Sequence, residues 1–386
     1  MKNLVILGST GSVGTQTLEV VAAFPDQFSI LGLSGGNKMD LLQTQITSFR
    51  PKWVCVKTAD QAKALQTWAK NRGLPLDIVY GDAGLIHIAT LSGTHCVVVA
   101  LSGTVALRPT YAALKAGIPI GLACKEVLVA AGQIMMALAS KKQVPILPLD
   151  SEHAALFQCL GGATCPIQDI ATLAITASGG PFRQRDARTF NTITREEALN
   201  HPKWNMGPKI TIDSATMMNK GLEVIEAHHL FQIPFKQIAV LVHPQSIVHG
   251  LVEFSNGTWL SQMGLPDMRF PIQYALMYPQ KIATPWPKMS LKDMASLTFE
   301  EPRLHDFPLL QFSFEVGLKG GSAPAVMNAA NEAAVALFLD KKIGFVDISA
   351  CVRTVTESTP YLSNPSFEDI VSLDHDIKQK VIKDYA

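Results

Sequence analysis

The chain has 386 residues, a length that predicts two or three domains rather than one. With 47% hydrophobic and 17% charged residues it can bury large cores, which excludes an intrinsically disordered protein. Its 33 Lys and Arg residues nearly balance 32 Asp and Glu residues, which argues against a nucleic-acid-binding surface. A small anionic substrate remains compatible with this balance, because it needs only a few local donors.

The cysteines and the first residues of the chain bear on its location. Six cysteines are scattered without a CxxC pair, so a zinc ribbon or a thioredoxin-like motif is not expected. No secretory leader pattern and no apolar run long enough to cross a bilayer is seen. We therefore expect a reduced, cytoplasmic protein with no membrane partner.

Short apolar runs alternate with helix-like stretches in residues 1–150. This pattern predicts an α/β domain with a doubly wound, Rossmann-like parallel sheet. The predicted strands are 4–7, 29–33, 53–56, 96–100, 119–122 and 144–148, and the helices between them include 16–24 and 61–71.

A glycine-rich turn follows the first predicted strand and opens a helix. Gly8, Gly11 and Gly14 have the spacing GxxGxxG. Small residues let the backbone approach a pyrophosphate, and the helix start offers free N–H groups. An ordinary strand-to-helix turn is the alternative, but this context favours dinucleotide binding.

The end of the second predicted strand indicates which dinucleotide is bound. NAD enzymes usually place an acidic residue there to hold the ribose hydroxyls. This chain has Ser34, Gly35, Gly36, Asn37 and Lys38 instead. Asn and Lys can bind a ribose phosphate, which favours NADP, although an acidic residue at position 40 lies nearby.

The remaining chain predicts three further regions. Residues 151–285 read as an α+β catalytic domain, with strands near 171–176, 238–242 and 247–254 and helices near 154–160 and 217–231. Residues 286–310 are rich in proline and predict a linker. Residues 311–386 predict a C-terminal helical bundle, with helices near 312–318 and 325–339.

Two acidic segments are candidate metal ligands. Asp150 and Glu152 follow the last predicted strand, and in an extended segment they would point to the same side. The alternative is that Asp150 or Ser151 caps the following helix. Glu223 and Glu226 share one face of a later predicted helix.

Ser214, Asn219 and Lys220 precede these glutamates and are good donors to a phosphate group. A capped amphipathic helix with a solvated charged face is the alternative for this segment. A hard oxygen-only site favours Mg or Mn over zinc, and no His or Cys cluster has zinc spacing.

The segment 178–208 predicts a lid loop. It starts with Gly179, Gly180 and Pro181 and ends near Trp204 and Met206, features typical of a mobile loop that closes over a ligand. A plain surface loop is the alternative.

Taken together, these segments resemble the 1-deoxy-D-xylulose 5-phosphate reductoisomerase family. The most specific matching stretches are 147–153, 177–183, 201–226, 243–249, 262–269 and 328–332. The resemblance implies NADPH and Mg or Mn as cofactors, a small phosphorylated sugar as substrate, and a homodimer. It implies rearrangement and reduction of 1-deoxy-D-xylulose 5-phosphate to 2-C-methyl-D-erythritol 4-phosphate in the non-mevalonate isoprenoid pathway.

The resemblance also implies roles for individual residues. The cofactor-binding residues would be Thr10, Gly11, Ser12, Val13, Gly36, Asn37, Lys38, Cys124, Glu126 and Gly207. The metal ligands would be Asp150, Glu152 and Glu223. The substrate-binding residues would be Lys125, Ser151, Glu152, Ser178, His201, Trp204, Met206, Ser214, Asn219, Lys220 and Glu223. The catalytic residues would be Lys125, Asp150, Glu152, His201 and Glu223.

Three departures from the family pattern concern the cofactor side. Cys124 stands where the family usually has Asn, Asn37 and Lys38 look exchanged in order, and Ala106 stands where Gly is common. Two other readings stay open. One is a semialdehyde dehydrogenase with Cys159 or Cys165 as nucleophile, and the other is a non-catalytic NADPH sensor.

Overall fold

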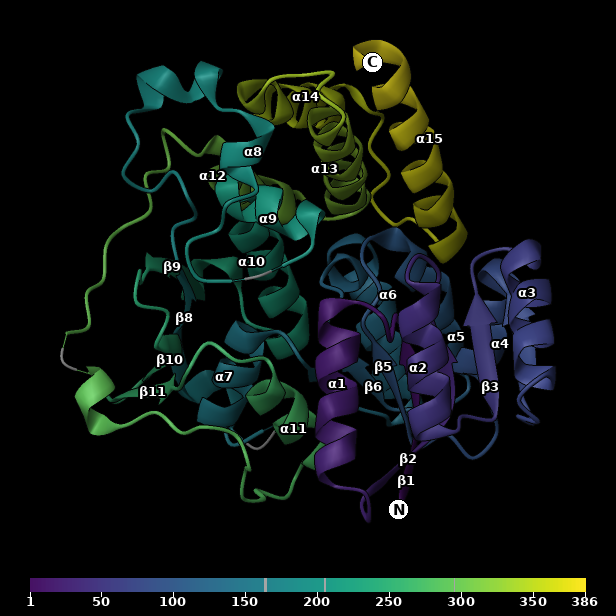
Figure 1. Ribbon diagram of the computed structural model, residues 1–386. Helices are drawn as coiled ribbons and strands as arrows, with labels where there is room; N and C mark the ends of the chain where they lie inside the picture. The colour runs from purple at the N-terminus through teal and green to yellow at the C-terminus, as the bar shows by residue number, and fades with distance from the viewer. Residues whose placement is uncertain (163–164, 205, 295) are drawn as a thin grey trace. The chain divides into compact units, whose positions relative to one another are not determined.

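The computed structural model describes residues 1–162, 165–204, 206–294 and 296–386 (Figure 1). The chain forms two compact units. Unit 1 comprises Met1–Val127, Met135–Ala154 and Met268–Trp286, and unit 2 comprises Leu128–Ile134, Ala155–Asp267 and Pro287–Ala386. No helix among the described residues is both long and apolar enough to cross a membrane.

Unit 1 is built on a parallel sheet of seven strands in the order β4-β3-β2-β1-β5-β6-β7. Their bounds are β1 Lys2–Leu7, β2 Phe28–Ser34, β3 Trp53–Val56, β4 Asp77–Tyr80, β5 Cys96–Val99, β6 Ile120–Leu122 and β7 Ile146–Pro148. The four residues Leu4–Leu7 are fully buried, as expected for a central strand covered on both faces. The strand order reverses between β1 and β5, and this reversal is where doubly wound sheets bind their ligands.

The helices of unit 1 connect these strands. They are α1 Ser12–Ala23, α2 Met39–Phe49, α3 Ala59–Lys70, α4 Gly81–Ala89, the short η1 Thr104–Ala106, α5 Leu107–Lys115 and α6 Glu126–Lys142, whose residues 128–134 belong to unit 2. From the centre of the sheet, the connection β1-α1-β2 leads toward β4, and the connection β5-α5-β6 leads toward β7. Because such crossovers are right-handed, they place helices on opposite faces of the sheet.

A late segment completes unit 1. Helix α11 (Arg269–Met277) packs against α1. The Lys2 ammonium donates to the carbonyl of Leu276 at 2.9 Å, and Arg269 pairs with Glu19 at 3.3 Å. Residues far along the chain thus stabilise unit 1.

Unit 2 contains a mixed sheet of four strands in the order β11-β10-β8-β9. The strands are β8 Ile170–Ala177, β9 Ile238–Val242, β10 Val248–Phe254 and β11 Trp259–Met263. Strand β8 pairs parallel with β9 and antiparallel with β10, which in turn pairs antiparallel with β11. This is the predicted α+β arrangement.

The helices of unit 2 pack around one hydrophobic cluster. They are α8 Arg195–Ala198, α9 Pro208–Ala215, α10 Met218–Phe231, α12 Pro308–Lys319, α13 Ala323–Leu339, α14 Phe345–Ser358 and α15 Phe367–Tyr385, with short turns η2 Ile167–Asp169, η3 Ala187–Thr192, η4 Phe235–Gln237 and η5 Leu291–Met294. Helix α7 (Ser151–Cys159) begins in unit 1 and ends in unit 2. Helix α13 packs against α14 and α15, which confirms the predicted C-terminal bundle. The predicted α/β fold class is therefore confirmed.

Candidate functional site

The glycine-rich turn leads from β1 into α1. Gly8 has φ +88°, and a β-carbon there would lie 2.5 Å from the carbonyl oxygen of Ala100. A β-carbon at Gly14 would lie 2.2 Å from the carbonyl oxygen of Gly8. Gly11 is the N-cap of α1, and no side chain caps the helix start. The turn is therefore closely packed, and its helix N-terminus is suited to an anionic group.

The end of β2 lies against this turn. The Gly8 N–H donates to Ser34 Oγ and the Ser9 N–H donates to the Ser34 carbonyl, both at 2.8 Å. Asn37 and Lys38 follow and are exposed. The predicted pyrophosphate turn and the predicted adenosine loop are thus joined directly.

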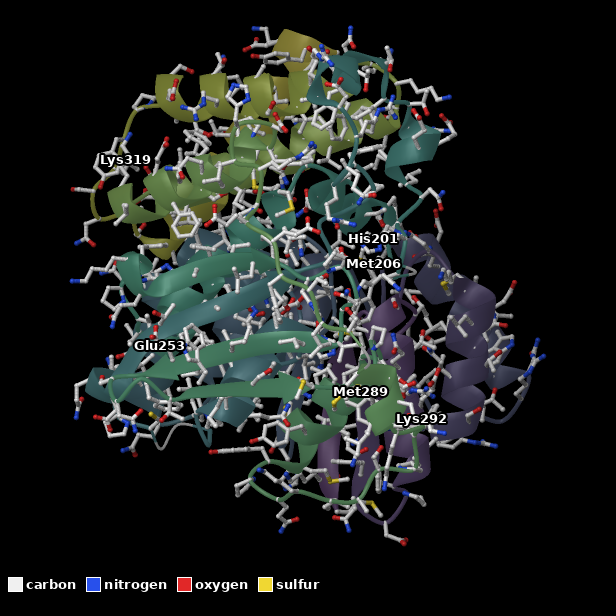
Figure 2. All side chains as sticks on the ribbon, turned by 90° about the vertical axis from the view of Figure 1, so that its left-hand side faces the viewer. His201, Met206, Glu253, Met289, Lys292 and Lys319 are labelled. Carbon is white, nitrogen blue, oxygen red and sulfur yellow. The ribbon has the colours of Figure 1, made fainter. Side chains whose placement is uncertain are left out.

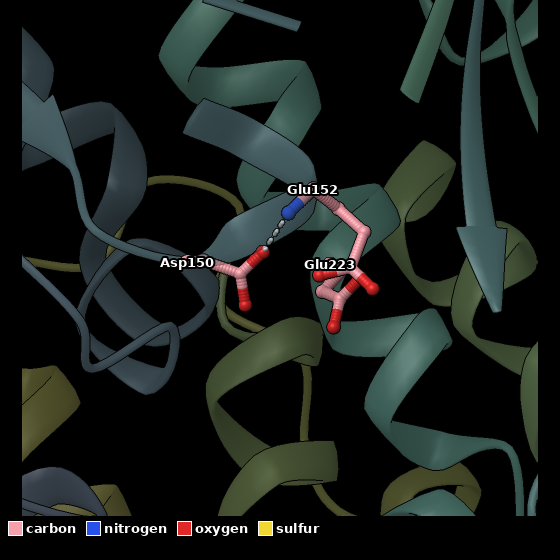
Figure 3. Close-up of side chains that lie close together, drawn as sticks. All are labelled: Asp150, Glu152 and Glu223. Atoms are coloured by element: carbon pink, nitrogen blue, oxygen red, sulfur yellow. Dashed lines mark hydrogen bonds between the residues drawn. The ribbon is translucent and has the colours of Figure 1, made fainter. Parts of the chain in front are cut away.

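The carboxylate of Asp150 is surrounded by donors within unit 1. Lys125 Nζ lies 3.0 Å from Asp150 Oδ2. Asp150 Oδ1 accepts from the N–H group of Glu152 at 3.1 Å (Figure 3). The same oxygen accepts from the N–H group of His153 at 3.3 Å and from Nδ1 of His153 at 2.9 Å. Ser151 Oγ donates to Glu152 Oε2 at 2.6 Å. The donors to Asp150 offset the negative charge of its carboxylate, which is mostly buried.

This geometry corrects one prediction. Asp150 and Glu152 do not alternate in an extended segment, because α7 begins at Ser151. Asp150 instead accepts hydrogen bonds from the first turn of that helix, which is the capping alternative.

The two residues beside Lys125 are also buried. The Cys124 thiol lies within hydrogen-bonding distance of two acceptors, the carbonyl of Gly103 at 3.3 Å and Glu126 Oε2 at 3.2 Å. Gly103 has φ +76°. The thiol at position 124 therefore ties the loop after β5 to the start of α6.

Helix α10 presents the second acidic segment within unit 2. Glu223 is 1% exposed, and its two oxygens accept from Asn219 Nδ2 and Lys220 Nζ, each at 2.5 Å. Met217, with φ +61°, forms the turn between α9 and α10. The predicted phosphate donors Asn219 and Lys220 thus contact the predicted metal ligand one helical turn away.

The Ser178 hydroxyl is oriented by its neighbours. His201 Nδ1 accepts from the backbone N–H groups of Lys203 and Trp204 at 3.2 and 2.9 Å, so the ring proton must lie on Nε2. That N–H donates to Ser178 Oγ at 3.1 Å, and the Gly180 N–H donates to the same oxygen at 3.3 Å. Because both contacts use lone pairs, the Ser178 proton can donate to a ligand.

The start of the predicted lid lies against the end of α9. Gly179 and Gly180 have φ +87° and +70°, and a β-carbon at Gly180 would lie 2.6 Å from the Ser214 carbonyl oxygen. The segments that carry Ser178 and Ser214 are therefore adjacent. Ser178 is a predicted substrate-binding residue, and Ser214 is a predicted phosphate donor.

The later part of the predicted lid segment leads into helix α9. Trp204 and Met206 are half-buried, and Gly207 is the N-cap of α9. Figure 2 shows His201 and Met206 among the side chains of unit 2. Asn205, which also falls in the predicted lid, lies outside the described residues. Closure of this segment stays a prediction.

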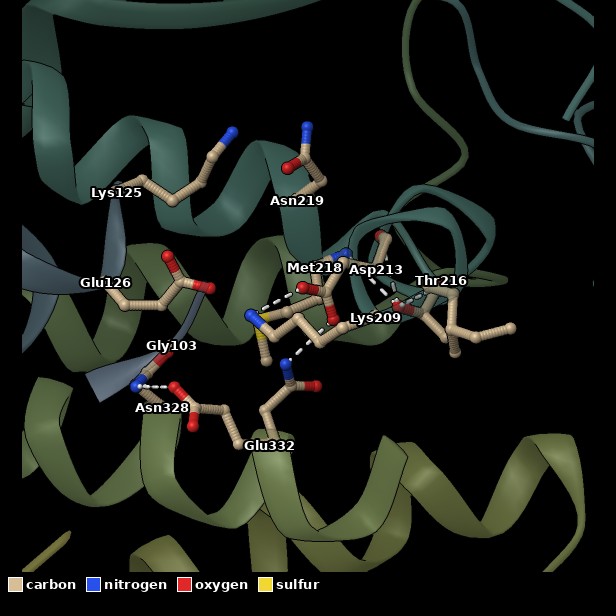
Figure 4. A network of polar contacts seen from close by, with 12 residues as sticks. Gly103, Lys125, Glu126, Lys209, Asp213, Thr216, Met218, Asn219, Asn328 and Glu332 are labelled. Carbon is tan, nitrogen blue, oxygen red and sulfur yellow. Dashed lines mark hydrogen bonds and ion pairs between the residues drawn. The ribbon is translucent and has the colours of Figure 1, made fainter. Parts of the chain in front are cut away.

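A buried polar network fixes α9. Asp213 is 1% exposed and pairs with Lys209 at 2.8 Å (Figure 4). It also accepts from Asn331 Nδ2 of α13 at 2.8 Å. Asp213 directly precedes Ser214. The network therefore positions a predicted phosphate donor from within the core.

The acidic side chains form a hard-oxygen donor set. Asp150 and Glu152 of unit 1 and Glu223 of unit 2 each offer a carboxylate oxygen, the type of donor that a hard metal ion binds. Such oxygen ligands fit Mg or Mn.

Comparison with known proteins decides the family. The family model for 1-deoxy-D-xylulose 5-phosphate reductoisomerase matches residues 4–132, and two C-terminal domain models of the same family match 146–231 and 263–380. A relative of that name from Heliobacterium modesticaldum is 50% identical over 97% of this chain and 95% of its own. One from Chlorobium chlorochromatii is 47% identical over 97% of each.

The chain belongs to the 1-deoxy-D-xylulose 5-phosphate reductoisomerase family. A solved reductoisomerase in complex with NADPH, fosmidomycin and magnesium has a TM-score of 0.95 and 38% identity, covering 99% of this chain and 98% of that one. The Zymomonas mobilis enzyme in complex with NADPH has a TM-score of 0.90 and 38% identity over the same shares. The family predicted from the sequence is confirmed.

Membership in the reductoisomerase family removes the cysteine-nucleophile alternative. Burial raises the pKa of the Cys159 thiol to about 11 and also raises the pKa of Cys165. Neither thiol is activated as a nucleophile would need to be. The structure thus agrees with the family in giving these cysteines no catalytic role.

Two residues that position side chains of the candidate site have little or no signal in the sequence. His153 contacts the Asp150 carboxylate through Nδ1. The available sequence signal was a histidine three residues after an aspartate at a helix start. Asn331 holds Asp213 from far along the chain, so no local spacing could have revealed the pair.

We expect His201 to stay neutral well below neutral pH. Burial, followed by the nearby charge of Lys220, lowers the pKa of His201 to about 4. Protonation would put a hydrogen on Nδ1 and break its two contacts with backbone N–H groups. Because this pKa lies below the ordinary value, the contribution of His201 to stability is full above about pH 6.5 and is lost as the pH falls toward 4.

Nitrogen NMR of histidine-labelled protein measures this directly, with His201→Gln to assign the signal. The resonances should keep the Nε2-protonated pattern down to about pH 5. A titration midpoint near pH 6.5 would contradict the assigned tautomer.

Proposed function

We propose that this chain converts 1-deoxy-D-xylulose 5-phosphate to 2-C-methyl-D-erythritol 4-phosphate with NADPH and a divalent metal ion, in the non-mevalonate isoprenoid pathway. The observation that carries the proposal is the family relationship over 97% of the chain, together with the acidic residues at 150, 152 and 223. A non-catalytic NADPH sensor would have no need for this oxygen donor set.

The residues fit the implied cofactors. Asp150, Glu152 and Glu223 would hold Mg or Mn, and the glycine-rich turn would hold the NADPH pyrophosphate. When bound, the metal would polarise the substrate ketone as a Lewis acid and NADPH would supply hydride. Thr10, Gly11, Ser12, Val13, Gly36, Asn37, Lys38, Cys124, Glu126 and Gly207 are the proposed cofactor-binding residues.

The chain's own side chains would bind and orient the substrate. Ser178, Ser214, Asn219 and Lys220 would donate to its phosphate, and Lys125, Ser151 and His201 would contact its oxygens. Ser178 supports this role because its two acceptor positions are taken and its proton is left to donate. Trp204 and Met206 would exclude water when the lid closes. Phosphate binding, remote from the reacting carbons, would help to drive that closure.

Removal of one metal ligand should strongly reduce turnover without weakening cofactor binding. Glu223→Gln keeps the shape of the side chain and removes its charge. Turnover with Mg should fall about a hundredfold or more, since a Lewis acid contributes several kcal/mol. The NADPH dissociation constant, measured by fluorescence, should stay within about twofold, because the predicted cofactor residues lie elsewhere in the sequence.

Glu253→Gln on β10 is the matched control and should change neither quantity. Near-native turnover of Glu223→Gln at saturating Mg would disprove the ligand assignment. NADPH oxidation by the native chain that does not depend on 1-deoxy-D-xylulose 5-phosphate would disprove the proposed reaction itself.

The phosphate site is tested by Ser178→Ala and Lys220→Ala. Hydrogen bonds to a charged group contribute about 1.5–3 kcal/mol, so each variant should lose about ten- to a hundredfold in kcat/KM. A substrate analogue without the phosphate should be poor for the native enzyme and little affected by either change. Ser178→Ala is the cleaner variant, since Lys220→Ala also removes a partner of Glu223.

Lys319→Met, at the exposed end of α12, serves as the control for loss of a lysine. Equal losses with the phosphorylated substrate and its dephosphorylated analogue would mean that Ser178 and Lys220 act elsewhere. The proposed phosphate site would then be wrong.

We also propose a homodimer in the cytoplasm. Strand β11 is the edge of its sheet, and Trp259, Leu260 and Met263 are 47%, 46% and 39% exposed. An exposed apolar edge strand can be covered by a second copy of the chain. Light scattering after gel filtration should give twice the chain mass, and Leu260→Lys should shift it toward the monomer; a native monomer would contradict the proposal.

A further inference from the structure

We propose that Lys57 is a specificity-determining residue that binds the 2′-phosphate of NADPH together with Lys38. Lys57 follows β3 and was not among the residues implied by the family. The inference rests on the proposed placement of the adenosine end at Gly36, Asn37 and Lys38. It adds the second cation that distinguishes a phosphate from a ribose hydroxyl.

Strand register brings Lys57 beside this loop. Strand β2 pairs in parallel with β3, with Ser34 opposite Cys55. The Gly35 N–H continues the ladder to the Cys55 carbonyl at 3.1 Å. Gly36 and Lys57 each lie two residues beyond the Ser34–Cys55 pair. Because parallel strands end at one edge of the sheet, both residues leave the sheet on its ligand-binding side.

Gly36 makes room for the Lys57 side chain. A β-carbon at Gly36 would lie 3.1 Å from the β-carbon of Lys57 and within 3.9 Å of two further carbons of its stem. The backbone of Gly36 is not in the positive-φ region, so the position needs glycine for space rather than for conformation. The aliphatic stem of Lys57 thus lies against a predicted cofactor residue, while Lys57 as a whole is exposed.

Gln61 fixes the two loops in this arrangement. Its Oε1 accepts from the N–H groups of Lys57 and Thr58 at 3.0 and 3.2 Å. Its Nε2 donates to the Gly36 carbonyl at 2.5 Å. One side chain therefore links the end of β3, the start of α3 and the adenosine loop. Lys57 is held by the fold beside Gly36 rather than meeting it by chance on the surface.

The local charges fit a phosphate. A ribose phosphate carries a charge of about −1.5 to −2 near neutral pH, and Lys38 and Lys57 together match it. The acidic residues nearby, Asp40 and Asp60, lie in the first turns of α2 and α3 and are exposed. No side chain caps the start of α2, so its amide groups add a positive end to the same region.

The test compares dissociation constants of NADPH and NADH, measured by fluorescence without substrate. The variants are Lys57→Met, Lys38→Met, Lys57→Arg and the control Lys63→Met, an exposed lysine of the following helix α3. Lys57→Met should weaken NADPH about tenfold, leave NADH within about twofold and reduce the salt dependence of NADPH binding. Lys57→Arg should retain the NADPH preference, and Lys63→Met should have no effect. Unchanged thermal unfolding shows that the variants fold.

Each other outcome overturns a specific statement. If Lys38→Met weakens NADPH selectively and Lys57→Met does not, the role of Lys57 is wrong and the placement of the adenosine end stands. If neither variant changes the ratio of the two constants, the placement at this loop also fails. If Lys57→Met weakens NADPH and NADH equally, Lys57 contacts a part shared by both cofactors and does not determine specificity.

Discussion

A buried carboxylate has to be matched by a cation, and this constraint organises the side chains of the candidate site. Three acidic side chains with little exposure each have a lysine partner within 3.0 Å: Asp150 with Lys125, Asp213 with Lys209, and Glu223 with Lys220. Removing one partner of a buried pair costs about 3–5 kcal/mol, because the other charge is left uncompensated. The acidic residues and the lysines of this site therefore depend on each other, and the fold has to bring each pair together.

The pairing at α10 has a consequence for ligand binding. Glu223 is a proposed metal ligand, and its two contacts, Asn219 and Lys220, are proposed phosphate donors. A metal ion at Glu223 would take over the compensation of its charge, which leaves those donors available to a phosphate. Metal and phosphate would then favour each other's binding, and such coupling is necessarily reciprocal.

The sequence by itself determined the elements whose signal is local. The GxxGxxG turn, the buried strands β1 to β3, the missing acid after β2 and the strings around Asp150 and Glu223 were sufficient to predict the fold class, the family and NADPH. Two strands gave no such signal. Strand β4 (Asp77–Tyr80) offers only a short apolar run, and β11 (Trp259–Met263) has no regular alternation of apolar and polar residues, so periodicity alone does not mark either segment as a strand.

Only the tertiary structure decided which groups meet. Local spacing left Asp150 either in an extended segment or at a helix start, and the start of α7 at Ser151 settled it. The contact of Asp213 with Asn331 joins residues 118 positions apart, and that of Lys57 with Gly36 depends on the register of two neighbouring strands. Sequence patterns report the periodicity of single elements, whereas these contacts arise from packing between elements, and packing is fixed only when the whole core forms.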